Sequence, residues 1–149
     1  MRIILSLKNI FYLFVFLAFI LVSCEDREEY IPYVEVSFSV DLNINNNLAT
    51  PGYSMLYPGE GFGGVIVYCE YYDYVTPDKS IFKAYDAACT LEVEDSCSVT
   101  NTGNSFYGEC PCCHSQYEFT NGQPVEGDAA YSLKRYKATV ISNKVYVRN

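Results

Sequence analysis

Apolar and polar side chains alternate in the early part of the chain, where five apolar residues from Val34 to Leu42 are separated by four polar ones. A period of two predicts a strand with one buried face. Residues 63–68 form an apolar run after a glycine-rich turn, which predicts a second, buried strand. Residues 80–85 follow the turn sequence at 76–79 and predict a third.

The clearest hairpin lies near the C-terminus, where residues 136–141 and 144–148 flank Ser142 and Asn143. Residues 43–52 read as a loop, because asparagines and a Pro-Gly pair interrupt the apolar pattern. No long stretch after residue 24 has the period of a helix. The pattern therefore predicts an all-β fold built from many short strands.

The first residues have the organisation of a signal peptide. Arg2 and Lys8 precede the apolar run 10–22, which is too short to cross a bilayer, since that takes about 20 apolar residues. The run ends in Leu-Val-Ser and Cys24, which resembles the lipobox of bacterial lipoproteins. This resemblance implies cleavage before Cys24 and attachment of acyl chains to its thiol. The alternative is an ordinary secreted protein in which Cys24 stands there by chance.

The expected organisation is a signal peptide over 1–23, an acidic tether over 24–32 and a β domain over 33–149. Without the signal peptide the chain has 8 basic and 18 acidic residues, since Arg2 and Lys8 are removed from 10 basic residues. This acidity argues against a nucleic-acid partner, which needs basic patches. The protein is instead expected to attach to the membrane through its lipid anchor.

Four acidic residues follow the predicted anchor directly, and such a charged run is typical of a solvated tether. They are Glu25, Asp26, Glu28 and Glu29. A run of this kind also resembles the surface-export signals of Bacteroidetes lipoproteins. The resemblance implies attachment to the outer membrane, with the domain facing the periplasm or the cell surface.

The middle of the chain has a different composition. Five of the seven cysteines and the single histidine lie between residues 89 and 114. Strand propensity falls there and turn residues become frequent, so a cysteine-rich loop region over about 89–117 is expected inside the β domain. Cys69 is set apart in an apolar strand, where a buried free thiol is expected.

This region resembles a Rieske-type [2Fe–2S] domain, and the similarity extends over about residues 42–147. The resemblance rests mainly on the second cysteine loop, which reads Cys110-Pro111-Cys112-Cys113-His114-Ser115-Gln116-Tyr117. It implies small antiparallel sheets or a β-sandwich with a two-loop tip. In that family two cysteines bind one iron and two histidines bind the other.

The chain departs from the family at both histidine positions. Leu91 stands where the first loop has its histidine, and Cys113 stands where the second loop has its own. The chain contains one histidine in all, so the usual cluster with two cysteine and two histidine ligands cannot be assembled from it.

The first interpretation is a domain that has no standard cluster and is cross-linked by disulfides, because exported cysteines usually oxidise. The resemblance implies a bracing disulfide between Cys97 and Cys112. Two thiolates on one tetrahedral metal lie about 3.7 Å apart, so modest movement would bring them to the S–S distance of about 2.05 Å. Cys89 is therefore expected to pair with Cys110 or Cys113.

The second interpretation is a remodelled centre for zinc or an iron–sulfur group. Its ligands would be Cys89, Cys110 and Cys113, with His114 or Cys97 as the fourth. Against this, a lone histidine on a loop is more often a solvated side chain than a ligand. The first interpretation predicts a structural or binding role without catalysis, and the second predicts electron transfer or metal binding.

Overall fold

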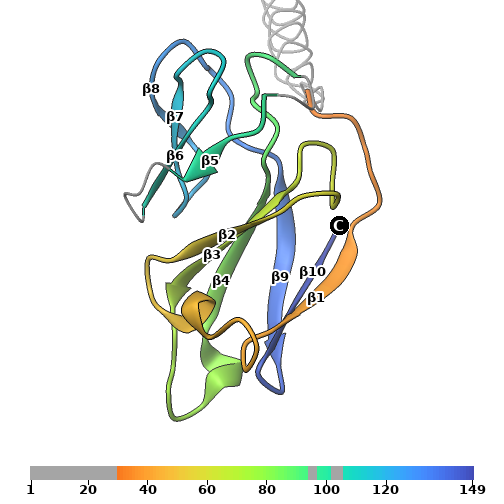
Figure 1. The fold of residues 1–149 in the computed structure, drawn as a ribbon, viewed down its shortest axis with the longest axis vertical. Coiled ribbons are helices and arrows are strands. Elements are labelled where there is room, and N and C mark those ends of the chain that lie inside the picture. The colour runs from red at the N-terminus through yellow and green to blue at the C-terminus, as the bar shows by residue number, and fades with distance from the viewer. Residues whose placement is uncertain (1–29, 94–96, 102–105) are drawn as a thin grey trace, which may run out of the picture.

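The computed structural model describes residues 30–93, 97–101 and 106–149, and these form two antiparallel β-sheets (Figure 1). The predicted signal peptide, Cys24 and the acidic residues after it lie outside the described residues. Within the described ranges no helix is long and apolar enough to cross a membrane. The predicted all-β class and antiparallel sheets are confirmed.

The larger sheet has six strands in the order β1-β10-β9-β4-β3-β2. Their bounds are Ser37–Asp41 for β1, Ser54–Tyr57 for β2, Val65–Tyr71 for β3, Ile81–Asp86 for β4, Arg135–Ile141 for β9 and Lys144–Arg148 for β10. Two short 3₁₀ helices, Asn46–Ala49 and Pro77–Lys79, lie in the connections that the sequence predicts as a loop and a turn.

The smaller sheet has four very short strands in the order β5-β6-β7-β8. Their bounds are Thr100–Asn101 for β5, Tyr107–Glu109 for β6, Gln116–Glu118 for β7 and Pro124–Glu126 for β8. This sheet is inserted between β4 and β9 and lies at one end of the larger sheet (Figure 1). The predicted cysteine-rich insertion is therefore partly a sheet.

Strand β3 is buried on both of its faces, which explains its continuous apolar sequence. Val65 and Val67 face a core formed with β1, β9 and β10. Ile66 and Tyr68, on the opposite face, pack in a second core with the smaller sheet. Alternation along one strand therefore divides the domain into two cores; Cys69 lies in the first, and the second contains Cys89, Cys97 and Cys110.

The predicted hairpin forms between β9 and β10, with Ile141 opposite Lys144. Ser142 and Asn143 both have positive φ angles, 52° and 59°. This is the conformation of a two-residue turn that follows the right-handed twist of the strands. The turn lies at the far end of the large sheet from the cysteine loops (Figure 1).

A fully buried carboxylate, Asp86 at the end of β4, joins three segments of the chain. It accepts hydrogen bonds from the backbone N–H groups of Phe62, Gly63 and Ala88 at 2.8–2.9 Å and from the Tyr136 hydroxyl at 2.7 Å. The glycine turn fits closely here, because a Cβ atom on Gly63 would lie 2.5 Å from the Ala88 nitrogen. The residues that lead into the first cysteine loop are held by this one side chain.

The described residues that precede β1 also pack against the domain. Ile31 is 3% exposed, and the ring of Tyr30 stacks on that of Tyr131 at 4.0 Å between centroids. Further on, Val36 N–H donates to the Asn149 side-chain oxygen at 2.6 Å. The last residues of the predicted tether therefore pack against the β domain.

Replacing Asp86 by asparagine should destabilise the domain by about 3 kcal/mol, because the charged acceptor of four buried hydrogen bonds is lost. Urea unfolding monitored by circular dichroism measures the change. Asp78→Asn is the matched control: this exposed carboxylate accepts from Ser142 N–H, and its loss should change stability by less than about 0.5 kcal/mol. Equal effects of the two substitutions would contradict the role given to Asp86.

Candidate cysteine site

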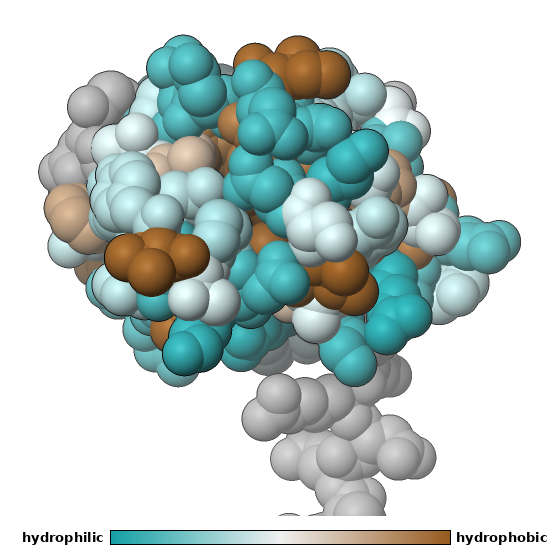
Figure 2. Space-filling model, turned by 90° about the horizontal axis from the view of Figure 1, so that it is seen from below, coloured by the Kyte–Doolittle hydropathy of each residue, from teal (hydrophilic) through white to brown (hydrophobic). Residues whose placement is uncertain are grey.

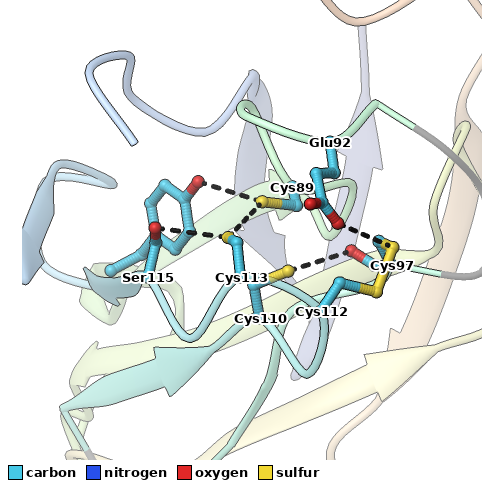
Figure 3. The surroundings of a disulfide bond; sticks show 8 residues. Cys89, Glu92, Cys97, Cys110, Cys112, Cys113 and Ser115 are labelled. Atoms are coloured by element: carbon cyan, nitrogen blue, oxygen red, sulfur yellow. Dashed lines mark hydrogen bonds between the residues drawn. A yellow bond between two sulfur atoms is a disulfide. The ribbon is translucent and has the colours of Figure 1, made fainter. Parts of the chain in front are cut away.

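Two segments of the chain meet to form the site (Figure 3). The first follows β4, and its Ala88 forms a β-bridge with Ser98. The second is the connection between β6 and β7, where Cys110 N–H donates to the Ser115 carbonyl at 3.0 Å. Cysteines far apart in sequence are thereby brought to one end of the second core.

Cys97 and Cys112 are joined by a disulfide, with their Cα atoms 5.8 Å apart and a sequence separation of 15. This is the pair that the Rieske resemblance implies. The bond links the two cysteine segments to each other directly (Figure 3). Glu92 lies beside it, with Cys97 Sγ at 3.6 Å from a carboxylate oxygen.

Three free thiols converge next to the disulfide. The Sγ atoms of Cys89, Cys110 and Cys113 all lie within 4.8 Å of one another, and Cys89 and Cys110 are fully buried. The structure does not contain the second disulfide predicted from Cys89 to Cys110 or Cys113: all three are free thiols, and Cys89 Sγ and Cys113 Sγ lie 3.5 Å apart. That is hydrogen-bond distance for sulfur and well beyond the S–S bond length of about 2.05 Å.

A hydroxyl network surrounds Cys89. The Tyr117 hydroxyl lies 3.5 Å from Cys89 Sγ and 2.9 Å from Thr90 Oγ1, and it accepts from Thr90 N–H at 3.2 Å. Thr90 Oγ1 in turn donates to the Tyr131 carbonyl at 2.7 Å. The thiol is therefore coupled through two side chains to the segment that precedes β9.

The environments of the buried thiols differ electrostatically. Burial raises the pKa of Cys110 to about 12. Burial also acts to raise the pKa of Cys89, but hydrogen bonds from Tyr117 and from the backbone N–H groups of Glu92 and Leu91 outweigh it and lower that pKa overall. The hydrogen bonds thus favour a thiolate at Cys89, while Cys110 stays protonated at neutral pH.

Cys113 and Ser115 complete the edge of the thiol cluster. Cys113 Sγ is partly exposed and donates to Ser115 Oγ at 3.3 Å. Ser115 is fully buried and also accepts from Ala129 N–H at 3.1 Å. The fixed serine orients the one thiol of the cluster that solvent can reach.

His114 does not join the thiols, so its predicted place as a metal ligand is not supported by this geometry. Its backbone N–H donates to the Cys110 carbonyl at 2.9 Å, and its φ of 58° turns the side chain away from the cluster. The imidazole Nδ1 lies 2.8 Å from Glu109 Oε1, and the side chain is 77% exposed. The imidazole of His114 is therefore held by the carboxylate of Glu109, outside the thiol cluster.

The residues present do not fit a standard Rieske cluster. Leu91 provides no ligand atom and is 46% exposed, and Cys113 supplies sulfur in the place of nitrogen. Among the described residues, two groups of possible ligand atoms lie at the tip: the three thiols, and Glu92 with the disulfide cysteines Cys97 and Cys112; neither contains an imidazole. A Rieske centre takes two imidazole ligands, and the chain contains one histidine.

Sequence patterns identified the cysteines but gave no role to the hydroxyl groups around them. Tyr117 and Ser115 are recognisable only as parts of the second-loop motif, and Thr90 has no signal in the sequence. Their roles depend on contacts over 14 to 41 residues, such as those from Thr90 to Tyr131 and from Ala129 to Ser115. Cys69 agrees with its prediction, because it is a fully buried free thiol whose pKa burial raises to about 12.

No family model and no curated protein matches the chain. Among solved structures, the plasma membrane Rieske protein of the cyanobacterium Synechocystis PCC 6803 is similar, with 22% identity and a TM-score of 0.49 over 78% of this chain and 100% of that one.

Two ferredoxins are similar as well. That of the carbazole 1,9a-dioxygenase of Nocardioides aromaticivorans IC177 has 16% identity and a TM-score of 0.47, over 77% of this chain and 97% of its own. The Sphingomonas yanoikuyae B1 ferredoxin has 16% identity and a TM-score of 0.46, over 67% of this chain and 88% of its own. At these low scores the similarities assign neither a family nor a cofactor to this chain.

Alkylation of the folded, non-reduced protein should modify Cys113 first, because it is the only partly exposed thiol of the three in the cluster. Cys69, Cys89 and Cys110 should react only after unfolding, and Cys97 and Cys112 only after reduction. Peptide mapping by mass spectrometry measures the order of modification. Alkylation of Cys97 or Cys112 before reductant is added would contradict the disulfide.

Proposed function

We propose that this chain is a lipid-anchored protein of the outer membrane whose β domain has a structural or binding role without a standard [2Fe–2S] cluster. One observation carries the proposal: the ligand positions at the tip bring together three thiols and no imidazole. The lipobox resemblance at Cys24 supports the anchor, and the disulfide between Cys97 and Cys112 is typical of proteins exported to an oxidising compartment.

The proposed role is not enzymatic. A cysteine nucleophile is ordinarily activated by a histidine within hydrogen-bond reach. Here the single histidine is directed to Glu109 on the solvent side, and Cys89 contacts Tyr117 and Cys113 instead. The hydrogen bonds at the tip thus fix the positions of the side chains, and none of them joins the histidine to a cysteine.

The covalent link between the segments gives the tip that shape. In the family it resembles, a metal cluster would join the two loops, and here the disulfide between Cys97 and Cys112 joins them. Closing a loop of this length contributes about 3 kcal/mol by the chain-entropy estimate. The disulfide can therefore stabilise the cysteine segments in the absence of a cluster.

A second candidate function is binding of a single soft metal ion by Cys89, Cys110 and Cys113. The observation in its favour is the mutual closeness of the three Sγ atoms, within 4.8 Å. Thiolates bound to zinc at about 2.3 Å lie about 3.7 Å apart, so small movements of these side chains would enclose an ion. Zinc or copper(I) suits such a thiolate set, and a water or an external group would complete the coordination.

The absence of a standard cluster can be tested by restoring the missing ligands. The natural protein, prepared anaerobically with iron and sulfide, should show no Rieske signal in electron paramagnetic resonance after reduction. The double variant Leu91→His, Cys113→His combines two histidines with Cys89 and Cys110, so it should take up more iron and sulfide than the natural protein. A Rieske signal from the natural protein would overturn the proposal.

The metal-binding candidate has a matched pair of variants. Cys110→Ser removes one of the three convergent thiols and should lower zinc content at least tenfold. His114→Ala removes a side chain that lies outside the thiol cluster, so it should leave zinc content unchanged. Elemental analysis after dialysis against zinc measures both. Metal-free natural protein, or equal loss in the two variants, would exclude the three-thiol site.

A further inference from the structure

We propose that the cysteine-bearing end of the domain faces the lipid surface on which the protein is anchored, and that the opposite end points away from it. The inference rests on the lipid anchor at Cys24 proposed above. The evidence for the orientation is the point at which the chain enters the domain. The sequence pattern did not show where this point lies.

The entering segment is fixed to the residues that precede β9. The Tyr30 ring stacks on the Tyr131 ring with 4.0 Å between centroids and 27° between planes, and Ile31 is almost fully buried. Lys134 Nζ lies 5.4 Å from the centroid of the Tyr33 ring. Several consecutive residues thus hold the entry point in place against the segment from Tyr131 to Lys134.

That entry point lies beside the thiol cluster. Tyr131 accepts the hydrogen bond from Thr90 Oγ1, Thr90 contacts the Tyr117 hydroxyl, and this hydroxyl contacts Cys89 Sγ. In Figure 1 the first described residues lie next to the loop that follows β4, at the end of the domain that also carries the small sheet.

The length of the connecting chain limits how far this end can be from the membrane. Six residue steps separate Cys24 from Tyr30, and a fully extended chain spans at most about 3.6 Å per residue. The entry point therefore lies within about 20 Å of the acylated residue. Strand β9 runs from Arg135, which pairs with Tyr85 near this end, to Ile141, about 20 Å further away.

The end that carries the entry point exposes side chains that suit a membrane interface. Tyr30, Tyr131 and Leu91 are each exposed by almost half near the entry point. Tyrosine is favoured at the headgroup level of membranes, where its ring is apolar and its hydroxyl is solvated. Figure 2 shows the opposite end, where apolar residues lie in separate spots among hydrophilic ones. Ile44, Tyr74 and Val75 are exposed by 75–92% there, so the orientation rests on the entry point and the short connection and not on a difference in apolar surface.

Charge limits how deeply this end approaches the lipid. Four acidic residues lie between Cys24 and Tyr30, and Glu92 is exposed in the first cysteine loop. Negative charge is repelled by anionic lipids, so the surface that fits is a zwitterionic one, contacted at headgroup level. The partly exposed Cys113 then becomes accessible chiefly to partners that are themselves at that surface.

The absence of tryptophan from the chain permits a direct test. Leu91→Trp places a single fluorophore at the cysteine end, and Ile141→Trp places one at the far end; both positions are exposed. The acylated proteins are inserted into phosphatidylcholine vesicles containing dansyl-headgroup lipid, and energy transfer from tryptophan is measured. Transfer should be at least twofold more efficient for Leu91→Trp. Equal or reversed efficiencies would overturn the orientation.

Two controls separate this inference from the anchor on which it rests. Acylated protein should float with the vesicles, and Cys24→Ala protein should not; failure of the natural chain to float refutes the anchor itself. Inserting fifteen Gly/Ser residues between Glu29 and Tyr30 should make the two tryptophan variants transfer equally. Persistence of the difference with the long linker would show that the six-residue connection does not set the orientation.

Discussion

The carboxylate of Asp86 is the interaction on which the rest of the structure depends. It is completely buried, and four donors from three separate segments are directed at its two oxygens. An ionised carboxylate is stable in such a place only when it is fully hydrogen-bonded, because its desolvation is costly. The turn before β3, the residues after β4 and the hydroxyl on β9 are therefore held in one arrangement. Cys89 follows Asp86 by three residues and takes its position from it.

From that position several side-chain contacts assemble the site. The disulfide links the two cysteine segments, and the hydroxyls of Tyr117 and Ser115 each contact one thiol of the cluster. The result is a close set of sulfur atoms, while the His114 imidazole lies outside that set and contacts Glu109. The thiols at this tip can be oxidised to disulfides or can bind soft metal ions.

The sequence was most informative where burial follows a simple period. Strand β3, strand β4 and the β9–β10 hairpin could be predicted from apolar runs and turn residues, and the burial of Cys69 followed from its place in such a run. The small sheet was not predicted, because strands of two or three residues are too short to establish a period. Strand β2 was missed for a similar reason, because it has only four residues and they follow a proline-glycine turn sequence.

The candidate site was predictable in composition and less so in geometry. The resemblance implied the disulfide between Cys97 and Cys112, which the structure contains. The exclusion of His114 depends on a positive φ and on Glu109, and neither can be read from a cysteine motif. Whether Cys89 and Cys113 meet as thiols or as a disulfide depends on about 1.5 Å of separation, given their 3.5 Å distance and the length of an S–S bond.

We propose that the site of Cys89, Cys110 and Cys113 holds no standard [2Fe–2S] cluster. The most direct measurement is native mass spectrometry of the protein released anaerobically from its own membrane. The account predicts the mass of the acylated chain less two hydrogens for the disulfide, with at most one metal ion added. A mass increased by two irons and two sulfides would contradict it.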